Sequence, residues 1–350
     1  MKKSSKPSKS ALKHDLFAHQ AREQKIGILG DPLQRIEAYI QFSALAAEVD
    51  RIAPRPSSLL GGRPAFPTET MVRILVLKQL YNLSDEQMEF QLLDRMSYQR
   101  FCGLQDVSNI PDRTTIWTFA NRIGTAGAQA LFDAAHAQLL RQGFIARAGQ
   151  IVDATLVPAP KQHLRQEDKA IIEQKATPAD WNAPKRRQKD TDASWTKKHG
   201  KSHFGYKLSI NIDAQNKLIR KIKTDTAKVH DSQHLKALVN TNNTNVQVFA
   251  DRGYPSAEHT MWLKAQGLKD RIQNKGSKTK ALTQRAKARN KTIAKTRARV
   301  EHVFASMRQM GGKLIRTVGQ ARADFALTLM ATCYNIKRLS WLKARGINPH

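Results

Sequence analysis

The chain has 350 residues and carries 59 lysines and arginines against 29 aspartates and glutamates, a formal net charge of +30. So large a positive charge attracts polyanions over long distances and favours nucleic acid as the partner. No stretch approaches the 18 consecutive apolar residues of a membrane span, and no apolar run follows the basic N-terminus as in a secretory signal. We therefore expect a cytoplasmic protein without membrane contact, and the length predicts about two domains.

The cysteines exclude two further classes of site. Only Cys102 and Cys333 are present, too few and too far apart for a disulfide framework or a cysteine-based zinc site. We expect both thiols to pack as small apolar groups.

The N-terminal part predicts a flexible arm followed by helices. Residues 1–30 are basic and polar, as in an arm that adds nonspecific affinity for polyanions. Apolar residues recur at helical spacing over 31–52, and residues 31–145 as a whole predict an all-helical domain. A helix-turn-helix-like DNA-binding module and a plain helical bundle both fit, because no recognition helix stands out.

Capping residues mark where several of these helices begin. Thr68, Ser84 and Asp112 each precede a helical pattern, and Gln87 completes a capping box with Ser84. A further helical stretch covers 125–142. The sequence therefore predicts tandem short helices in this part of the chain.

The pattern changes near residue 150. The apolar run 151–157 predicts a strand, the polar and charged residues 161–200 predict a mobile loop, and the alternation over 206–225 predicts a hairpin that turns at 213–216. Residues 245–254 predict a strand that ends in a turn, and short helices are expected at 230–239 and 256–267. Strands followed by alternating helix and strand indicate an α/β sandwich with a mixed sheet.

Residues 270–313 are the most basic part of the chain, and an amphipathic helix over 299–310 is predicted within them. Its apolar stripe consists of Val300, Val303, Phe304 and Met307. Such a helix holds basic side chains on an ordered edge, where contacts with phosphates become geometrically useful.

Three acids occupy unusual positions in this basic chain. Asp153 interrupts the apolar strand at 151–157, Asp251 ends a second apolar strand, and Glu301 lies beside the apolar stripe of the amphipathic helix. A buried carboxylate without a partner is costly, so Asp153 is expected to be paired, neutralised or bound to a metal. Carboxylates that converge in a positive groove would bind hard divalent cations suited to in-line displacement at phosphorus. Turn, cap and ion-pair roles are the ordinary alternatives.

Blocks of sequence around these acids resemble a known family. They are VDATLV at 152–157, DASWTKKHGKSHFGYKLSI at 192–210, VFADRGY at 248–254 and RARVEHVFASMR at 297–308. Together with GRPAFPTETMVRILVLKQLYNLSDEQMEFQL at 62–92, they resemble the DDE transposases of bacterial insertion sequences, specifically the insertion sequence 5 group within the insertion sequence 4-like superfamily. The resemblance implies an α+β fold, in which the helical domain is followed at 146–345 by a ribonuclease-H-like mixed-sheet catalytic core with flanking helices.

The same resemblance implies roles for individual residues. Asp153 on the first core strand, Asp251 on the fourth and Glu301 on a following helix would be the catalytic acids and the metal ligands. The family's signature Y-x2-R-x3-E-x6-K is matched by Arg297 and Glu301, whereas Arg308 stands in place of its lysine and Ala294 in place of its tyrosine. We expect Arg297, Glu301 and Arg308 to share one helix face, with both arginines binding phosphates.

Each of the other basic residues near these acids has two possible roles. Arg252 binds phosphate or simply balances Asp251. Lys198, Lys201 and Lys207, which lie in a block that resembles the family, contact DNA or are ordinary surface lysines. His230, followed by Asp231, resembles a family position near the end of the third strand, and a capping role is equally open.

The implied function is that of an insertion-sequence transposase, associated with the bacterial nucleoid. It would bind the terminal inverted repeats of its element, cleave DNA with two Mg²⁺ ions, for which Mn²⁺ can substitute, and join the 3′-hydroxyl ends to target DNA. A homodimer on DNA follows from the need to cut two ends together. A related site-specific nuclease, a non-catalytic DNA-binding regulator and an RNA-binding scaffold are the alternatives.

Overall fold

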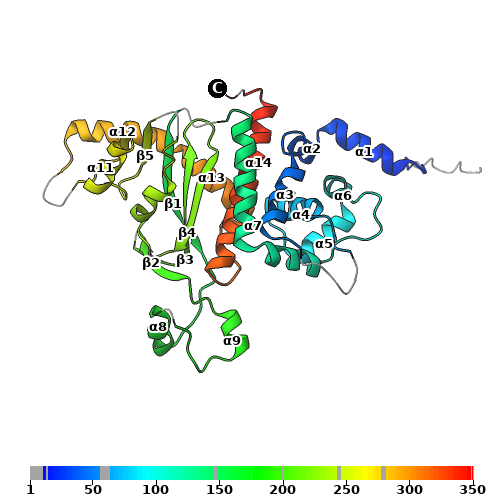
Figure 1. Ribbon diagram of the computed structural model, residues 1–350, viewed down its shortest axis with the longest axis horizontal. Helices are drawn as coiled ribbons and strands as arrows, with labels where there is room; N and C mark the ends of the chain where they lie inside the picture. Colours follow the sequence, from blue (N-terminus) through cyan, green and yellow to red (C-terminus); the bar gives the residue numbers. More distant parts are fainter. Residues whose placement is uncertain are drawn as a thin grey trace, which may run out of the picture.

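The computed structural model describes residues 11–12, 15–55, 64–144, 148–174, 176–198, 200–242, 246–276, 281–347 and 349. A mixed sheet with its flanking helices forms one half of the molecule and a group of helices forms the other, and the long helices α7 and α14 run side by side between them (Figure 1). Residues 1–10, 13 and 14 of the arm predicted at 1–30 lie outside the described residues. No helix of the described segments is long and apolar enough to cross a bilayer.

The N-terminal half is helical, as predicted for residues 31–145, but its first helix lies in the segment 1–30 that was predicted as a flexible arm. Its helices are α1 (Ala18–Leu29), α2 (Pro32–Glu37), α3 (Phe42–Ile52), α4 (Thr68–Leu80), α5 (Asp85–Asp94), α6 (Met96–Cys102) and α7 (Arg113–Arg141). The expected single helix over 31–52 is wrong, because the chain leaves helical geometry between α2 and α3. The Gln138 side chain accepts a hydrogen bond from the Gln41 backbone N at 2.9 Å and donates one to its O at 3.0 Å, so α7 supplies partners for the interrupted backbone.

Two of the three predicted caps are confirmed. Ser84 and Gln87 form the capping box of α5, and Asp112 accepts a hydrogen bond from Thr115 N at the start of α7. Thr68 is not a cap, because α4 begins after Pro67 and the Thr68 hydroxyl instead donates to Asp50 at 2.7 Å. A long-range contact has replaced the local one.

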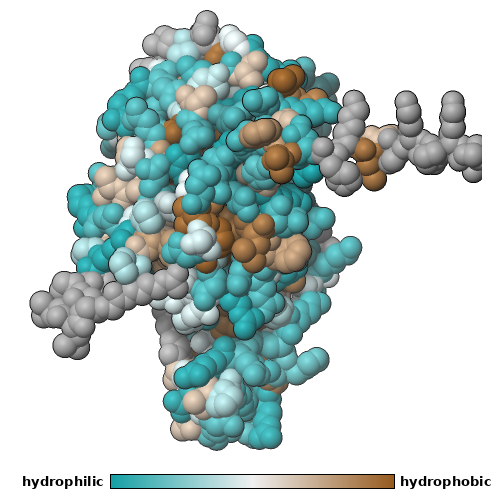
Figure 2. Space-filling model, turned by 90° about the vertical axis from the view of Figure 1, so that its right-hand side faces the viewer, coloured by the Kyte–Doolittle hydropathy of each residue, from teal (hydrophilic) through white to brown (hydrophobic). Residues whose placement is uncertain are grey.

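Figure 2 shows the molecule from the side of the helical half. Most of this face is hydrophilic, and apolar groups gather near its middle. Large apolar side chains that are exposed in this half include Tyr81, Phe90, Leu93 and Trp117.

The other half is built on a six-stranded sheet. Its strands are β1 (Gln150–Pro158), β2 (Ser194–Lys198), β3 (Lys201–Asp213), β4 (Ile219–Thr226), β5 (Gln247–Ala250) and β6 (Lys269–Ile272), in the order β2-β3-β1-β5-β6 with β4 beside β3. Strands β1 to β4 pair antiparallel, whereas β5 is parallel to both β1 and β6. The mixed sheet and the α+β, ribonuclease-H-like fold class are confirmed, and β5 is the fourth strand of the core when β2 is left aside.

Helices and short turns flank this sheet. They are the 3₁₀ turn η1 (Asp231–His234), α10 (Leu235–Leu238), α11 (Ala257–Ala265), α12 (Gln284–Arg297), α13 (Arg299–Met307), the π-helical turn η2 (Arg308–Gly312) and α14 (Gln320–Ala344). The predicted apolar stripe of α13 is confirmed, since Val300, Val303, Phe304 and Met307 are all buried.

The prediction of a mobile loop is wrong for about half of the segment. Residues 161–200 contain α8 (Gln166–Glu173), α9 (Ala183–Gln188) and β2, and the two helices project below the sheet in Figure 1. Buried Asp190 anchors the segment, because its carboxylate accepts hydrogen bonds from the Tyr206 hydroxyl at 2.8 Å and from Ala193 N at 2.9 Å. Trp181 is also buried. Because most residues of this segment are polar, its composition did not predict that Asp190 and Trp181 are buried.

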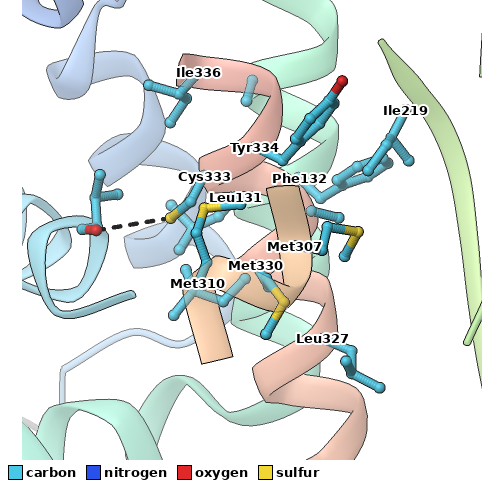
Figure 3. Close-up of a cluster of buried hydrophobic side chains, with 14 of the residues drawn as sticks. Leu131, Phe132, Ile219, Met307, Met310, Leu327, Met330, Cys333, Tyr334 and Ile336 are labelled. Atoms are coloured by element: carbon cyan, nitrogen blue, oxygen red, sulfur yellow. Dashed lines mark hydrogen bonds between the residues drawn. The ribbon is translucent and has the colours of Figure 1, made fainter. Parts of the chain in front are cut away.

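One continuous apolar core joins the two halves. Figure 3 shows α7, α13, η2 and α14 contributing Leu131, Phe132, Met307, Met310, Leu327, Met330, Cys333, Tyr334 and Ile336, with Ile219 of β4 facing them. Asn335 fastens α14 to β4, since its side chain accepts from Ile219 N at 2.8 Å and donates to Ile219 O at 2.7 Å. The core therefore crosses the boundary that the sequence predicts at 145 and 146. Both free cysteines are buried.

Candidate active site

Sheet register brings Asp153 and Asp251 to neighbouring positions. Ile151 of β1 pairs with Phe249 of the parallel strand β5, and each aspartate lies two residues further along its own strand direction. Because side chains alternate between the faces of a sheet, the Asp153 carboxylate projects from the same face as Ile151 and Phe249. Asp251 follows the last residue of β5, where its Oδ1 accepts a hydrogen bond from Gly253 N at 2.7 Å.

Arg297 connects Glu301 to this pair of aspartates. Its Nη1 forms a close ion pair with Asp153 Oδ2 and lies 3.6 Å from Glu301 Oε1. Arg297 is the last residue of α12, and Glu301 lies in the first turn of α13, with one residue separating the two helices. A single guanidinium nitrogen thus bridges the first and third acids.

The surroundings of Asp153 disfavour the charged form of its carboxyl. Its side chain is 7% exposed, and burial raises the pKa of its carboxyl to about 6, against the opposing effects of Arg297 and of the Ala154 backbone N–H. The negative charges of Asp251 and Glu301 raise this pKa further. Electrostatic coupling among the three acids follows from their proximity, although they are separated by 148 positions in the chain from first to last.

The three acids do not form a finished metal site as they stand. Within the described segments, no three carboxylate, imidazole or thiolate side chains are grouped closely enough to hold one ion. Arg297 supplies the positive charge that lets mutually repelling carboxylates approach. The residues fit a hard divalent cation nonetheless, because all three donors are carboxylates and the Glu301 side chain is 61% exposed and thus able to turn toward the aspartates.

The expectation that the signature residues Arg297, Glu301 and Arg308 share one helix face is wrong. Arg297 ends α12 and faces Asp153, whereas Arg308 begins η2 and lines a cleft of about 630 Å³ at the end of β1. The chain turns tightly here because Gly311 has a φ of 105° and a Cβ on Gly312 would lie 2.9 Å from Met307 O. Arg297 therefore belongs to the carboxylate site, and Arg308 belongs to the cleft beside β1.

The cleft beside β1 is lined by cations. Lys198, Lys201, Arg308 and Lys313 line it together with His203, and no acid of the described segments does so. Its wall includes Thr155, two residues after Asp153 on the same face of β1. The cationic cleft therefore adjoins the face of β1 that carries Asp153.

The remaining two predicted DNA contacts differ in exposure. Arg252 is exposed beside Asp251. Lys207 is buried, and its Nζ lies 2.5 Å from Asp231 Oδ1 and donates to Val229 O. The Lys207 ammonium is thus engaged inside the protein.

Family models match both halves of the chain. The model described as "Transposase DDE domain" covers residues 146–336, more than half of the chain and all three acids, and "Transposase domain (DUF772)" covers residues 20–122. The chain belongs to the DDE transposase family. It is also similar in structure to a piggyBac transposase solved by cryo-EM in a synaptic complex with hairpin DNA, with a TM-score of 0.44, 14% sequence identity, and coverage of 91% of this chain and 77% of the other.

The sequence does not identify several residues near the transposase's acids. Lys201 was predicted, with Lys198 and Lys207, as a candidate DNA contact in a block that resembles the family, whereas Lys313 carries no motif of its own. Asp231 stands out only as the neighbour of His230, whose capping role is confirmed by the hydrogen bond that it accepts from Ser232 N. Only the fold places Asp231 against Lys207.

The raised pKa of Asp153 predicts how the metal-free transposase responds to pH. Its pKa in the folded protein is about 6 and its ordinary value is 3.8. Between these values the folded state binds the proton more tightly than the unfolded chain does, so the free energy of unfolding falls as pH rises from 4 to 6, and this loss persists above pH 6. Asp153→Asn removes the effect, and we expect the variant to be about 1–3 kcal/mol more stable than the wild type at pH 8 but not at pH 4.

Thermal unfolding in EDTA between pH 4 and pH 8 measures this difference. Asp94→Asn, which changes an exposed carboxylate at the end of α5, is the control and should give a curve parallel to the wild type. A constant gap between Asp153→Asn and the wild type across the pH range would contradict the prediction.

Proposed function

We propose that this protein is an insertion-sequence transposase of the insertion sequence 5 group, which binds the terminal inverted repeats of its element, cleaves DNA and joins the ends to a target. The observation that carries the proposal is the placement of Asp153 and Asp251 at adjacent parallel strands, with Glu301 tied to Asp153 through Arg297. Family membership supports the reaction class, and the charge of +30 supports the substrate.

The proposed chemistry consists of two displacements at phosphorus. In the first, a water oxygen forms the new P–O bond, the P–O3′ bond breaks, the departing oxygen becomes the 3′-hydroxyl and the surplus proton passes to solvent. In the second, that 3′-hydroxyl attacks a target phosphodiester and releases a target 3′-hydroxyl. One P–O bond is exchanged for another in the second step, so no nucleotide hydrolysis is needed.

Divalent cations held by Asp153, Asp251 and Glu301 would supply the activation of the attacking oxygen and the stabilisation of the leaving oxygen. Arg297 balances the acids in their absence and is placed to contact a phosphate once it is released from Asp153. Arg252, exposed beside Asp251, provides a second cation for the scissile strand. Guanidinium groups suit this task because they bind phosphate oxygens in a bidentate manner.

We assign the adjoining strand of DNA to the cationic cleft of Lys198, Lys201, Arg308 and Lys313. Its cations come from two separate segments and face one space, which is the arrangement that a phosphate backbone requires. Lys207 does not belong to this group of DNA-binding cations, because its ammonium is paired with Asp231. We assign it instead to holding η1 against β3.

Removing cleft lysines should weaken DNA binding and reduce its salt dependence. We expect Lys201→Ala and Lys313→Ala each to lower the slope of log affinity against log salt by about 0.9 for every phosphate that the removed ammonium neutralises. Fluorescence anisotropy of a labelled duplex at several salt concentrations gives the slope. Lys264→Ala on α11, exposed and outside the cleft, should leave it unchanged. An equal effect of all three substitutions would show that the cleft lysines make no specific contact with DNA.

A joining assay tests the proposed function against its alternatives. Labelled duplexes from both flanks of the coding region are incubated with the protein, Mg²⁺ and a target plasmid. We expect cleavage with a free 3′-hydroxyl and transfer of label to the plasmid. Cleavage without transfer would identify a nuclease, and binding without cleavage would identify a regulator. We propose a homodimer on the two ends, which sedimentation of the DNA complex would reveal as two chains per pair of ends.

A further inference from the structure

A second group of basic residues gathers at the turn between β3 and β4. Lys217 lies in this turn, Arg299 begins α13, Arg338 lies in the last turns of α14 and Arg345 directly follows that helix. None of the four lines the cleft beside β1. We call these four residues the turn cluster.

Two arginines of the turn cluster bind the backbone of the turn itself. Arg299 donates to Ala214 O, and Arg338 Nε donates to Asn216 O at 2.8 Å. Backbone carbonyls carry no net charge, so these hydrogen bonds position both guanidinium groups without neutralising them. The two positive charges are thus fixed beside the turn.

An aromatic ring holds a third cation next to them. The guanidinium carbons of Arg338 and Arg345 lie 4.3 Å and 4.5 Å from the centroid of the Trp341 ring, which is 40% exposed. A guanidinium at this distance from an indole is attracted by the ring and keeps its charge. Trp341 therefore brings two arginines together at the protein surface.

No acid forms an ion pair with the turn cluster among the described residues. Asp213, the acid at the start of the turn, is buried, and its carboxylate accepts hydrogen bonds from Gln215 N at 2.9 Å and Asn216 N at 2.8 Å. The cations repel one another, and an anion that binds among them relieves this repulsion. The arrangement therefore suits an anionic partner.

The turn cluster and the cationic cleft lie at opposite ends of β1. Gln150, the first residue of β1, pairs with Asp213 at the turn, whereas Thr155 lines the cleft and Asp153 lies between the two ends. At about 3.3 Å per residue, Gln150 and Thr155 are about 17 Å apart, which corresponds to about five phosphates along one strand of DNA. The two groups of cations therefore bind different phosphates.

We propose that the turn cluster is a second DNA-binding site, which holds the phosphate backbone of duplex DNA on the side of the carboxylates opposite to the cationic cleft. The proposal rests on the proposed function, because the carboxylates define where the DNA is cut. Guanidinium and ammonium groups form strong charge-assisted hydrogen bonds with phosphate oxygens. A duplex bound at both sites is fixed on both sides of the bond that is cleaved.

A double substitution, Lys217→Asn with Arg345→Gln, removes two charges of the turn cluster. Lys217 has a φ of 62°, and asparagine adopts this left-handed region more readily than most residues. Arg345 is exposed, so glutamine replaces it without disturbing the core. We expect the melting temperature of the double variant to match that of the wild type.

Fluorescence anisotropy at several salt concentrations tests the site on a labelled duplex that extends to both sides of the cleavage point, mapped first with the wild type in Mg²⁺. We expect the slope of log affinity against log salt to fall by about 0.9 for each phosphate that the double variant no longer neutralises. Lys264→Gln with Lys269→Gln is the matched control. It removes two exposed lysines of α11 and β6 and should keep the wild-type slope.

Two shortened duplexes, each ending at the cleavage point on one side, locate the site. We expect one of them to abolish the effect of the double variant while Lys201→Ala in the cleft keeps its effect, and the other to do the reverse. An unchanged slope of the double variant on the long duplex would overturn the second site, as would the loss of both effects on the same shortened duplex. A wild-type chain that binds the long duplex without cleaving it would overturn the proposed function, and the slope on this uncut duplex would still decide whether the turn cluster binds DNA.

Discussion

Asp251→Asn should abolish DNA cleavage while leaving DNA binding intact. Asparagine has nearly the same shape, and its side-chain oxygen can still accept the hydrogen bond from Gly253 N, so the turn after β5 is preserved. The substitution removes one of the negative charges that would hold a divalent cation beside Asp153. We expect the rate of strand cleavage to fall by about a thousandfold or more, which corresponds to a loss of roughly 4 kcal/mol of transition-state stabilisation.

Single-turnover cleavage of an end duplex in Mg²⁺ measures this rate, and anisotropy measures the binding. Affinity for DNA should stay equal or rise, because a carboxylate that repels phosphate has been neutralised. Asp94→Asn makes the same chemical change on an exposed site in the helical half and should cut at the wild-type rate. Undiminished cleavage by Asp251→Asn would remove this residue from the proposed metal site.

Phe132→Ala should destabilise the whole protein and not only its helical half. Phe132 of α7 is 2% exposed and lies in the core that α7, α13 and α14 share with β4 (Figure 3). Truncating a buried phenylalanine typically costs about 3–5 kcal/mol of unfolding free energy, because the cavity left behind collapses only partly. Since this core is common to both halves, we expect them to unfold in one transition at lower denaturant concentration.

Urea denaturation followed by far-UV circular dichroism and by tryptophan fluorescence tests both parts of this prediction. Trp117 reports on the helical half, and Trp181 and Trp262 report on the sheet half. The two signals should coincide and shift together in Phe132→Ala. Phe90→Ala on α5, where the ring is 63% exposed, should change stability by less than about 0.5 kcal/mol. Separate transitions, with only the first one shifted, would show that the halves fold independently.

Local chemistry allowed much of the fold to be predicted from the sequence. The strand around Asp153, the hairpin at 213–216, the capping box at Ser84 and the buried stripe of α13 each depend on residues close together in the chain, and all are confirmed. The failures occurred where a distant group overrides local preference. Gln138 stabilises the break between α2 and α3, and buried Asp190 orders a segment whose composition indicates a loop.

The sequence likewise predicts some features of the candidate site and not others. Charge patterning, strand-borne acids and the family blocks identify Asp153, Asp251 and Glu301 as candidates without coordinates, because these features are properties of residue types and their order. The sequence does not reveal that Arg297 stands between two of the acids or that Lys207 is engaged by Asp231. Pairing, burial and hydrogen bonding depend on distances across the sheet, and those distances are fixed only when strand register and helix packing bring separate segments together.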